Sequence, residues 1–383
     1  MSEHSQVSGV QIELTEVTKR YPGQQAAAVE SVSMTIPAGE TVVFVGPSGC
    51  GKTTTMKMIN RLIEPTSGRI TIGGQDALGL DPDELRRGIG YAIQQAGLFP
   101  HLTVAQNVGM VPGLLKWDRK RVADRVEEML DLVGLDPGEF AGRYPRQLSG
   151  GQQQRVGVAR ALAADPPVLL MDEPFGAVDP ITRGNLQDEL LRLQAELGKT
   201  IVFVTHDFDE AVKLGDRIAV LGDRSRILQY DTPEAILANP ADDTVAGFVG
   251  AGASLKQLTL RRVREVELSE VPTAGVGDSV ADLAERLGRR RGAVGLVLDT
   301  RRRPLRWVTP PDLSTGVSLD RAGRAVEDTV AMASTLHDAL EAVLTDDDGL
   351  AVVTGGRGEY VGVVTMDTLM AAVRAMREEL ETA

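Results

Sequence analysis

Cysteine is almost absent from this sequence of 383 residues, in which Cys50 is the only one. A single cysteine excludes an intramolecular disulfide, and without a secretory signal near Met1 we expect a reducing, cytosolic compartment. No apolar run approaches the roughly 18 residues that a membrane-spanning helix needs, so membrane involvement would come through a partner. Positive net charge is lacking too: the formal value of −13 argues against a general nucleic-acid binder.

The length predicts two or three domains, and 42% hydrophobic residues are enough for buried cores. Charge is spread unevenly along the chain. Residues 251–306 carry 12 Lys and Arg against 7 Asp and Glu, whereas residues 307–383 carry 5 against 14. This asymmetry predicts a C-terminal part that is organised separately.

A phosphate-binding loop of the pattern G-x-x-x-x-G-K-[ST] is the most informative segment, because a strand-like run precedes it and a helical pattern follows it. Its glycines let consecutive N–H groups point at a polyphosphate, and the helix after it presents its positive dipole end there. The expected phosphate contacts are Gly46, Pro47, Ser48, Gly49, Cys50, Gly51, Lys52, Thr53 and Thr54. Lys52 would reach the β and γ phosphates, and the Thr53 hydroxyl would bind Mg²⁺. We expect Cys50 to act only as a small side chain in a tight loop.

Two further apolar runs, residues 168–171 and 200–204, predict buried strands that end in polar residues. Ligands of open α/β sheets bind at such strand ends. Asp172 is expected in the Mg²⁺ shell and Glu173 beside an attacking water. His206 is expected to contact the γ-phosphate; the alternative is a solvent-exposed histidine at a strand end.

The pattern between residues 99 and 165 is helical without a strand, which predicts a helical insertion in an α/β domain. Within it, Ser149 followed by Gly150, Gly151 and Gln152 begins a helix. This is an anion-binding arrangement when a phosphate loop accompanies it, and otherwise a simple cap. Tyr21 follows the first predicted strand and either stacks on a nucleotide base or packs under a turn.

Taken together, these motifs resemble the ATP-hydrolysing subunit of ATP-binding cassette (ABC) transporters over about residues 10–240. The signature LSGGQ at residues 148–152 is the most specific of them. The resemblance implies an α/β P-loop NTPase fold with a helical subdomain at about residues 95–165. It also implies the following roles: Gln94 as the Q-loop glutamine and a metal ligand, Asp172 and Glu173 as the Walker B pair, Asp179 as the D-loop aspartate, His206 as the switch histidine, and Tyr21 as the adenine-stacking aromatic.

The family further implies ATP and Mg²⁺ as ligands and a two-fold homodimer in which the signature of one chain faces the ATP of the other. It implies permease subunits, an extracytoplasmic substrate-binding protein, no nucleic acid, and a peripheral position on the cytoplasmic face of the inner membrane. The run QQAGLFPH at residues 94–101 is similar to importers of glycine betaine, carnitine and choline. Alternatives are an importer ATPase for another small solute such as an amino acid, a soluble cassette ATPase that acts on nucleic acid or ribosomes, and a nucleotide-responsive binding module in which hydrolysis is incidental.

Beyond an ATPase domain at residues 1–240 we expect a linker at 241–254 and a module at 255–383. Two segments, about 255–313 and 325–376, repeat at an offset of 56 residues as helix, strand, strand and helix, and should pair. They resemble a tandem CBS (cystathionine-β-synthase) module. Thr309 and Asp312 match its ribose-contacting pattern, but Thr368 replaces the second aspartate and Arg306 a usual glycine. Adenine-nucleotide binding and a purely structural role both stay open.

Two arginine runs, residues 289–291 and 301–303, support a further hypothesis. Such clusters attract anionic lipid by about 1 kcal/mol per charge over a Debye length of roughly 8 Å. A salt-sensitive contact of this kind would switch transport on as internal ionic strength rises. The alternative is a solvated basic loop balanced by the acidic second half.

Overall fold

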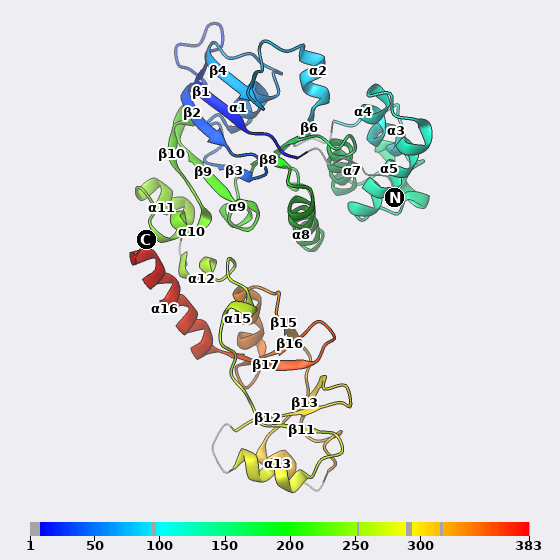
Figure 1. Cartoon of the computed structure of the whole chain (residues 1–383), viewed down its shortest axis with the longest axis vertical. Coiled ribbons are helices and arrows are strands. Elements are labelled where there is room, and N and C mark those ends of the chain that lie inside the picture. Colours follow the sequence, from blue (N-terminus) through cyan, green and yellow to red (C-terminus); the bar gives the residue numbers. More distant parts are fainter. Residues whose placement is uncertain (1–7, 94–96, 251–252, 289–292, 315–316, 383) are drawn as a thin grey trace. The chain divides into compact units, whose positions relative to one another are not determined.

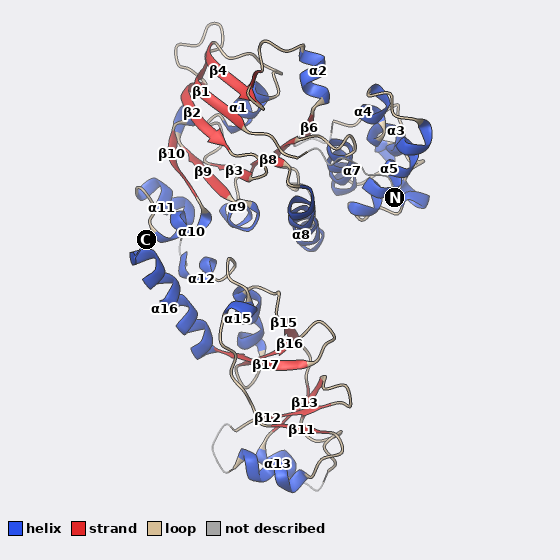
Figure 2. Ribbon diagram, in the orientation of Figure 1, coloured by secondary structure: helices blue, strands red, loops and turns tan. Residues whose placement is uncertain are grey.

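The computed structural model describes residues 8–93, 97–250, 253–288, 293–314 and 317–382 (Figure 1). By its internal contacts the chain divides into two compact units, residues 1–249 and 250–383. Both units combine helices with sheets (Figure 2). Among the residues described, we find no helix with the length and apolar character that a membrane crossing needs.

The first unit is built on two sheets within the described residues. One has the strand order β10-β9-β3-β8-β7-β6 and is parallel except for β10, and the other has the antiparallel order β2-β1-β4-β5. The bounds are β1 Ile12–Lys19, β2 Val29–Ile36, β3 Thr41–Val45, β4 Ser67–Ile72, β5 Gln75–Asp76, β6 Ile89–Ala92, β7 Val168–Asp172, β8 Thr200–Val204, β9 Arg217–Leu221 and β10 Ile227–Asp231.

The centre of the larger sheet explains where the site lies. Every residue of β3, β7 and β8 is buried, as continuous apolar runs predict for strands covered on both faces. The strands predicted at residues 168–171 and 200–204 are thereby confirmed. Because β3, β8 and β7 are parallel neighbours, their carboxyl ends meet at one edge of the sheet.

Helices cover this sheet and form the insertion. Aspartate, serine or threonine side chains cap most of their N-termini, among them Asp81, Ser149, Asp179 and Asp207. The described residues between 99 and 165 form helices and no strand, as predicted. The bounds are α1 Lys52–Ile59, α2 Pro82–Arg87, α3 Val104–Val108, α4 Met110–Leu114, α5 Arg119–Leu132, α6 Pro137–Phe140, η1 Pro145–Gln147, α7 Gly150–Leu162, α8 Pro180–Leu197, α9 Phe208–Leu214, η2 Asp223–Ser225, α10 Pro233–Ala238 and α11 Asp243–Val249.

The second unit contains the two repeats as expected, with strand pairs related by the offset of 56 residues. Its sheets have the orders β11-β12-β13-β14 and β15-β16-β17. Their faces share a buried cluster that includes Leu296, Trp307, Val352 and Val363, so the two copies pair. The bounds are α12 Ala253–Gln257, η3 Val263–Glu265, β11 Thr273–Gly275, α13 Val280–Leu287, β12 Gly295–Leu298, β13 Pro304–Val308, α14 Pro310–Leu313, β14 Arg324–Ala325, β15 Thr329–Ala331, α15 Leu336–Thr345, β16 Leu350–Thr354, β17 Tyr360–Thr365 and α16 Met366–Thr382.

The structure differs from the expected linker at residues 241–254. Asp243–Val249 forms helix α11 of the first unit, where Val245 and Val249 are buried, and Ala253–Gln257 forms α12 of the second. The boundary therefore falls between residues 249 and 250. The helical periodicity of these residues is weak because both helices are short, and Leu255 of α12 is exposed.

Candidate functional site

The phosphate loop joins β3 to α1 and adopts a backbone that only glycine adopts easily. Gly49 and Gly51 have φ of 81° and 112°. A Cβ at Gly46 would lie 2.2 Å from the carbonyl oxygen of Leu221, so a side chain does not fit there. No side chain caps the N-terminus of α1. The first N–H groups of this helix thus have no side-chain cap, which is compatible with the predicted contact to an anionic ligand.

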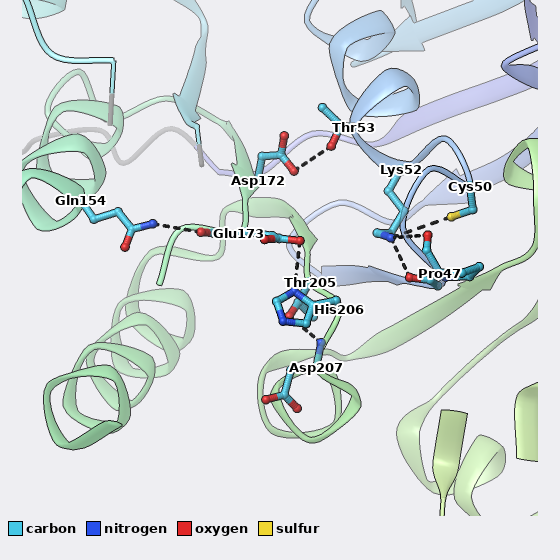
Figure 3. A network of polar contacts seen from close by, with 11 residues as sticks. Pro47, Cys50, Lys52, Thr53, Gln154, Asp172, Glu173, Thr205, His206 and Asp207 are labelled. Carbon is cyan, nitrogen blue, oxygen red and sulfur yellow. Dashed lines mark hydrogen bonds and ion pairs between the residues drawn. The ribbon is translucent and has the colours of Figure 1, made fainter. Parts of the chain in front are cut away.

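Lys52 and Thr53 are the first residues of α1 (Figure 3). The Lys52 ammonium is buried and donates to the carbonyl oxygens of Gly46 and Pro47 at 2.7 and 3.0 Å. Its charge is therefore held inside the loop. Thr54, the next residue of the helix, is half-buried.

Asp172 ends β7 and lies beside Thr53: the Thr53 hydroxyl donates to Asp172 Oδ1 at 3.1 Å. Burial, and secondarily the nearby Glu173, raise the pKa of Asp172, while the Thr53 hydrogen bond opposes them. The Thr53 hydroxyl and the Asp172 carboxylate, which come from α1 and β7, thus lie together, and oxygen ligands of this kind are those that Mg²⁺ prefers. Among the described residues no group of three or more His, Cys, Asp or Glu could hold a metal ion.

Glu173 and His206 contact each other at the same sheet edge. His206 Nδ1 lies 3.1 Å from Glu173 Oε1, and whether Nδ1 donates to this carboxylate depends on the tautomer of the imidazole (Figure 3). The Glu173 backbone has φ of 46°, a left-handed conformation that costs a non-glycine residue about 1–3 kcal/mol. Its amide donates to the Val204 carbonyl at 2.9 Å, which fixes it to β8. A strained backbone conformation of this kind persists only where contacts with the surrounding structure hold the residue in place.

The signature residues begin α7 and form a complete capping box. Ser149 Oγ accepts from the Gln152 amide at 3.3 Å, and Gln152 Oε1 accepts from the Ser149 amide at 2.9 Å. A Cβ at Gly151 would lie 3.2 Å from the Ala177 carbonyl, so the signature packs on the segment after Glu173, while Gly150 faces open space.

Asp179 caps α8 and accepts the Thr182 amide at 3.0 Å, and this backbone hydrogen bond holds the pKa of its carboxyl below the usual value. Tyr21 is half-buried, and the Lys19 ammonium lies 5.3 Å from the centre of its ring. Gln94 lies outside the described residues. The structure thus gathers Lys52, Thr53, Asp172, Glu173 and His206 at one edge.

Two residues that sequence reasoning missed support this edge. Ser225 is fully buried with φ of 58°; its amide donates to the Cys50 carbonyl at 2.6 Å and its hydroxyl lies 3.1 Å from Thr55 Oγ1. The buried Gln154 of α7 contacts the backbone of Glu173 and Ala177. No local pattern marks Ser225, and Gln154 stands in a run of three glutamines of which the helix buries one.

In the second unit, the Thr309 hydroxyl donates a hydrogen bond to the Asp312 carboxylate at 2.6 Å. The hydroxyls of Thr365 and Thr368 are hydrogen-bonded at 3.1 Å. The Arg306 guanidinium donates to the carbonyls of Ala322 and Gly323 at 2.7 and 2.6 Å.

Both arginine runs belong to the second unit. Asp299 accepts from the amides of Arg301 and Arg303 and pairs with the Arg303 guanidinium at 2.9 Å. The run at 301–303 is therefore partly neutralised, and residues 289–291 lie outside the described part.

Comparison with known proteins decides the family. The chain is 44% identical over 368 residues to the glycine betaine/carnitine/choline transport ATP-binding protein OpuCA of Bacillus subtilis, a match that spans 94% of this chain and 95% of that protein. It belongs to the ATP-binding subunits of ABC transporters. This family couples ATP hydrolysis to transport, which confirms the predicted family and activity.

Other matches agree with this family. The model of the ABC transporter family matches residues 29–176 of this ATP-binding subunit, and that of the CBS domain matches residues 327–375. The osmoprotectant import ATP-binding protein OsmV of Salmonella typhimurium is 54% identical over 65% of this chain and 66% of its own. A solved structure of the ATP-binding cassette MJ0796, described as a dimeric post-hydrolysis state bound to ADP and Pi, is 38% identical with a TM-score of 0.54, covering 58% of this chain and 98% of that one. The predicted fold class is thus confirmed.

Proposed function

We propose that this ATP-binding subunit energises the import of quaternary-ammonium osmoprotectants such as glycine betaine, carnitine and choline. The observation that carries the proposal is the match to OpuCA, which runs through both units of the chain. Relatives named for choline and carnitine transport are 59% and 58% identical over 62% and 61% of this chain.

A second substrate class comes from the spermidine/putrescine import ATP-binding protein PotA of Thermobifida fusca, which is 41% identical over 89% of this chain. Both classes carry positively charged nitrogen, and the described residues offer no site that separates them. Selection of the solute would rest with the permease and an extracytoplasmic binding protein.

In the catalytic step that we propose, the amides of the phosphate loop and the Lys52 ammonium bind the phosphates, with Lys52 exchanging its loop carbonyls for phosphate oxygens. Thr53, Asp172 and Gln94 would hold Mg²⁺, which when bound neutralises charge on the β and γ phosphates. A carboxylate oxygen of Glu173 takes the proton of the attacking water, while His206 orients Glu173 and contacts the γ-phosphate. Tyr21 would stack on adenine.

The proposed assembly is a two-fold dimer with ATP between the phosphate loop of one chain and Ser149, Gly150, Gly151 and Gln152 of the other. The N-terminus of α7, preorganised by its capping box, suits this role. Asp179 would lie at the same interface. The dimeric MJ0796 structures, similar over 58% of this chain, support the arrangement.

A groove in the first unit supports a membrane partner. It has a volume of about 640 Å³ and lies between the core, with Ile89 and Tyr91, and the helical insertion, with Phe99, Met110 and Leu114. Phe99 and Leu114 are 41% and 57% exposed, so the subunit shows apolar side chains to a partner. We propose that a cytoplasmic helix of the permease fills this groove, which would place the subunit peripherally on the inner membrane.

The test is reconstitution with permease and binding protein in vesicles, with uptake of labelled betaine, carnitine, choline and spermidine. We expect ATP-dependent uptake of at least one quaternary amine and ATPase activity stimulated by loaded binding protein. Uptake of spermidine alone would contradict the substrate class. Unstimulated ATPase with no uptake would contradict the transport role.

For the second unit we propose a structural pairing role in preference to adenine-nucleotide binding or anionic-lipid binding. The Thr309 and Asp312 side chains are engaged with each other, and the arginine run at 301–303 is partly paired with Asp299. Equilibrium dialysis with labelled AMP and ATP, and sedimentation with anionic vesicles, would test this with a variant that lacks residues 250–383 as reference.

A further inference from the structure

Gln154 is a buried amide held between two backbone groups of the turn that follows β7. It is 4% exposed and lies in the second turn of α7. Its Nε2 donates to the Glu173 carbonyl at 3.2 Å (Figure 3). Its Oε1 accepts from the Ala177 amide at 2.8 Å. One side chain thereby bridges the turn that carries the proposed general base.

This turn requires an external support. Glu173 has φ of 46°, a conformation that relaxes unless neighbours hold it. From one side, β8 accepts the Glu173 amide through the Val204 carbonyl at 2.9 Å. From the other side, Gln154 donates to the Glu173 carbonyl. The peptide units that flank the Glu173 Cα are therefore anchored to a strand of the core and to the helix of the signature.

The signature lies on that same helix. Gly151, one turn before Gln154, packs close to the Ala177 carbonyl. A rigid helix that moves at its N-terminus moves Gln154 with it, and Gln154 is bonded to the Glu173 carbonyl. In the dimer of the proposed function this N-terminus faces the nucleotide of the neighbouring chain.

We propose that Gln154 is a positioning residue that ties the placement of Glu173 to the signature helix of its own chain. Engagement of the signature with the neighbour's ATP is thereby transmitted to the base that serves the chain's own ATP. This inference rests on the proposed function, since it needs Glu173 as the base and the signature at the dimer interface.

The first test is Gln154→Met, which keeps the length of the side chain and removes its hydrogen bonds to Glu173 and Ala177. Because misplacing a catalytic group by about 1 Å costs up to about 100-fold, we expect kcat to fall roughly 10- to 100-fold. The Kd for Mg·ATP should change less than about twofold, since the phosphate loop is untouched.

The matched control is Gln194→Met. Gln194 also makes two side-chain hydrogen bonds to the backbone, donating to the carbonyls of Gly39 and Lys199, but it lies at the opposite edge of the sheet. A loss of buried amide contacts that only destabilises the fold would act alike in both variants. We expect kcat of Gln194→Met to stay within about twofold of the parent when both variants are assayed below their unfolding temperatures.

The second variant, Gln154→Glu, separates the two hydrogen bonds. It keeps an acceptor for the Ala177 amide and places a carboxylate against the Glu173 carbonyl. A buried carboxyl in that position has a raised pKa, and its protonated form restores the lost donor. The ratio of parent to variant kcat should therefore shrink as the pH is lowered from about 8 to about 6.

Each outcome decides. A kcat of Gln154→Met equal to that of Gln194→Met, or a loss confined to Kd, overturns the inference. If Gln154→Met does not fold, a pH-independent kcat ratio for Gln154→Glu overturns it. Slow turnover of Glu173→Gln together with normal turnover of Gln154→Met leaves the proposed function intact and removes only this inference, whereas normal turnover of Glu173→Gln removes both.

Discussion

In the first unit, side chains that follow β3, β7 and β8 contact partners far away in the sequence. In the second unit, the threonine that follows β13 and the threonine that ends β17 are hydrogen-bonded to the residue three positions on. Thr53 reaches Asp172 over 119 positions and His206 reaches Glu173 over 33. Thr309 meets Asp312 and Thr365 meets Thr368 locally. Long-range contacts assemble a site from several elements, while local ones cap a helix.

The two units also differ in where strained backbone and ion pairs are found. In the first unit, Glu173 and Ser225 hold left-handed backbones next to the phosphate loop and the sheet edge. In the second unit, Arg324 of β14 pairs with Asp346 and Asp348 at 2.7 Å each, and so links the sheet β11-β12-β13-β14 to the second copy. These contacts of the first unit lie at the predicted phosphate site, whereas the Arg324 ion pairs hold parts of the second unit together.

The largest expected effect is that of Glu173→Gln. General-base assistance is worth about 10²- to 10⁴-fold in rate, so we expect turnover at least a hundredfold slower with Mg·ATP binding retained. Steady-state phosphate release together with equilibrium ATP binding measures both. Asp312→Ala, in the second unit, is the control and should keep parental turnover. A Glu173→Gln variant within tenfold of the parent would move the base role elsewhere, with His206 the first alternative.

The next effect concerns Asp172→Asn. Burial raises the pKa of Asp172 in the folded protein. The free energy of unfolding therefore decreases as the pH rises from the unfolded-state pKa to the higher folded-state pKa, and above that value the decrease is complete. At neutral pH the variant without ligand should therefore melt at a higher temperature than the parent. The Mg²⁺ requirement for ATP binding should rise about 10- to 100-fold, as expected on losing part of a metal shell.

The same carboxyl gives a pH dependence. Mg²⁺ needs the ionised form of Asp172, so in the parent the Mg²⁺ affinity should fall as the pH drops through the raised pKa. Magnesium titrations at a series of pH values check this. A variant that melts below the parent, or a magnesium affinity that does not depend on pH, would contradict the assignment of Asp172.

A smaller effect is expected for Ser225→Gly. Glycine keeps the backbone at φ of 58° but removes the hydroxyl contacts to Cys50 and Thr55 beneath the phosphate loop. At about 1 kcal/mol for such hydrogen bonds, the Kd for Mg·ATP should rise about fivefold. Ser31→Gly is the matched control, because Ser31 has φ of 49° in an exposed part of β2. Equal Kd values for the two variants would show that Ser225 does not support the loop.

The smallest effect on activity is expected for Asp312→Ala. The Asp312 carboxylate accepts the Thr309 amide at 2.8 Å, and losing such a cap costs about 1 kcal/mol of unfolding free energy. Chemical denaturation followed by Trp307 fluorescence would register this, with ATP turnover unchanged. A loss of bound adenine nucleotide in this variant would instead show that the second unit binds a ligand, and its local contacts could then no longer be contrasted with the site of the first unit.

Much of this arrangement could be predicted from the sequence. The continuous apolar runs of β7 and β8 predicted buried parallel strands, and so the edge at which Asp172, Glu173 and His206 meet. The offset of 56 residues predicted the paired copies of the second unit. Each of these signals is local or repeated, and therefore visible in one chain.

The rest depends on tertiary contacts. No sequence rule predicts a serine with positive φ, because the contacts of Ser225 with Cys50 and Thr55 override the local preference. Gln154 forms a bridge only because α7 packs on the turn after β7. The edge strands β2 and β10 were not predicted either, since neither is a continuous apolar run: buried and exposed residues mix in β2, and β10 is only half-buried.

The central claim is that two copies of this chain hold ATP between the phosphate loop of one and the signature helix of the other. Analytical ultracentrifugation of Glu173→Gln with Mg·ATP tests it most directly, with bound nucleotide counted in the sedimenting species. We expect a dimer carrying two ATP molecules, and a monomer when Ser149→Arg is added. A strictly monomeric protein at high concentration with saturating Mg·ATP would contradict the account.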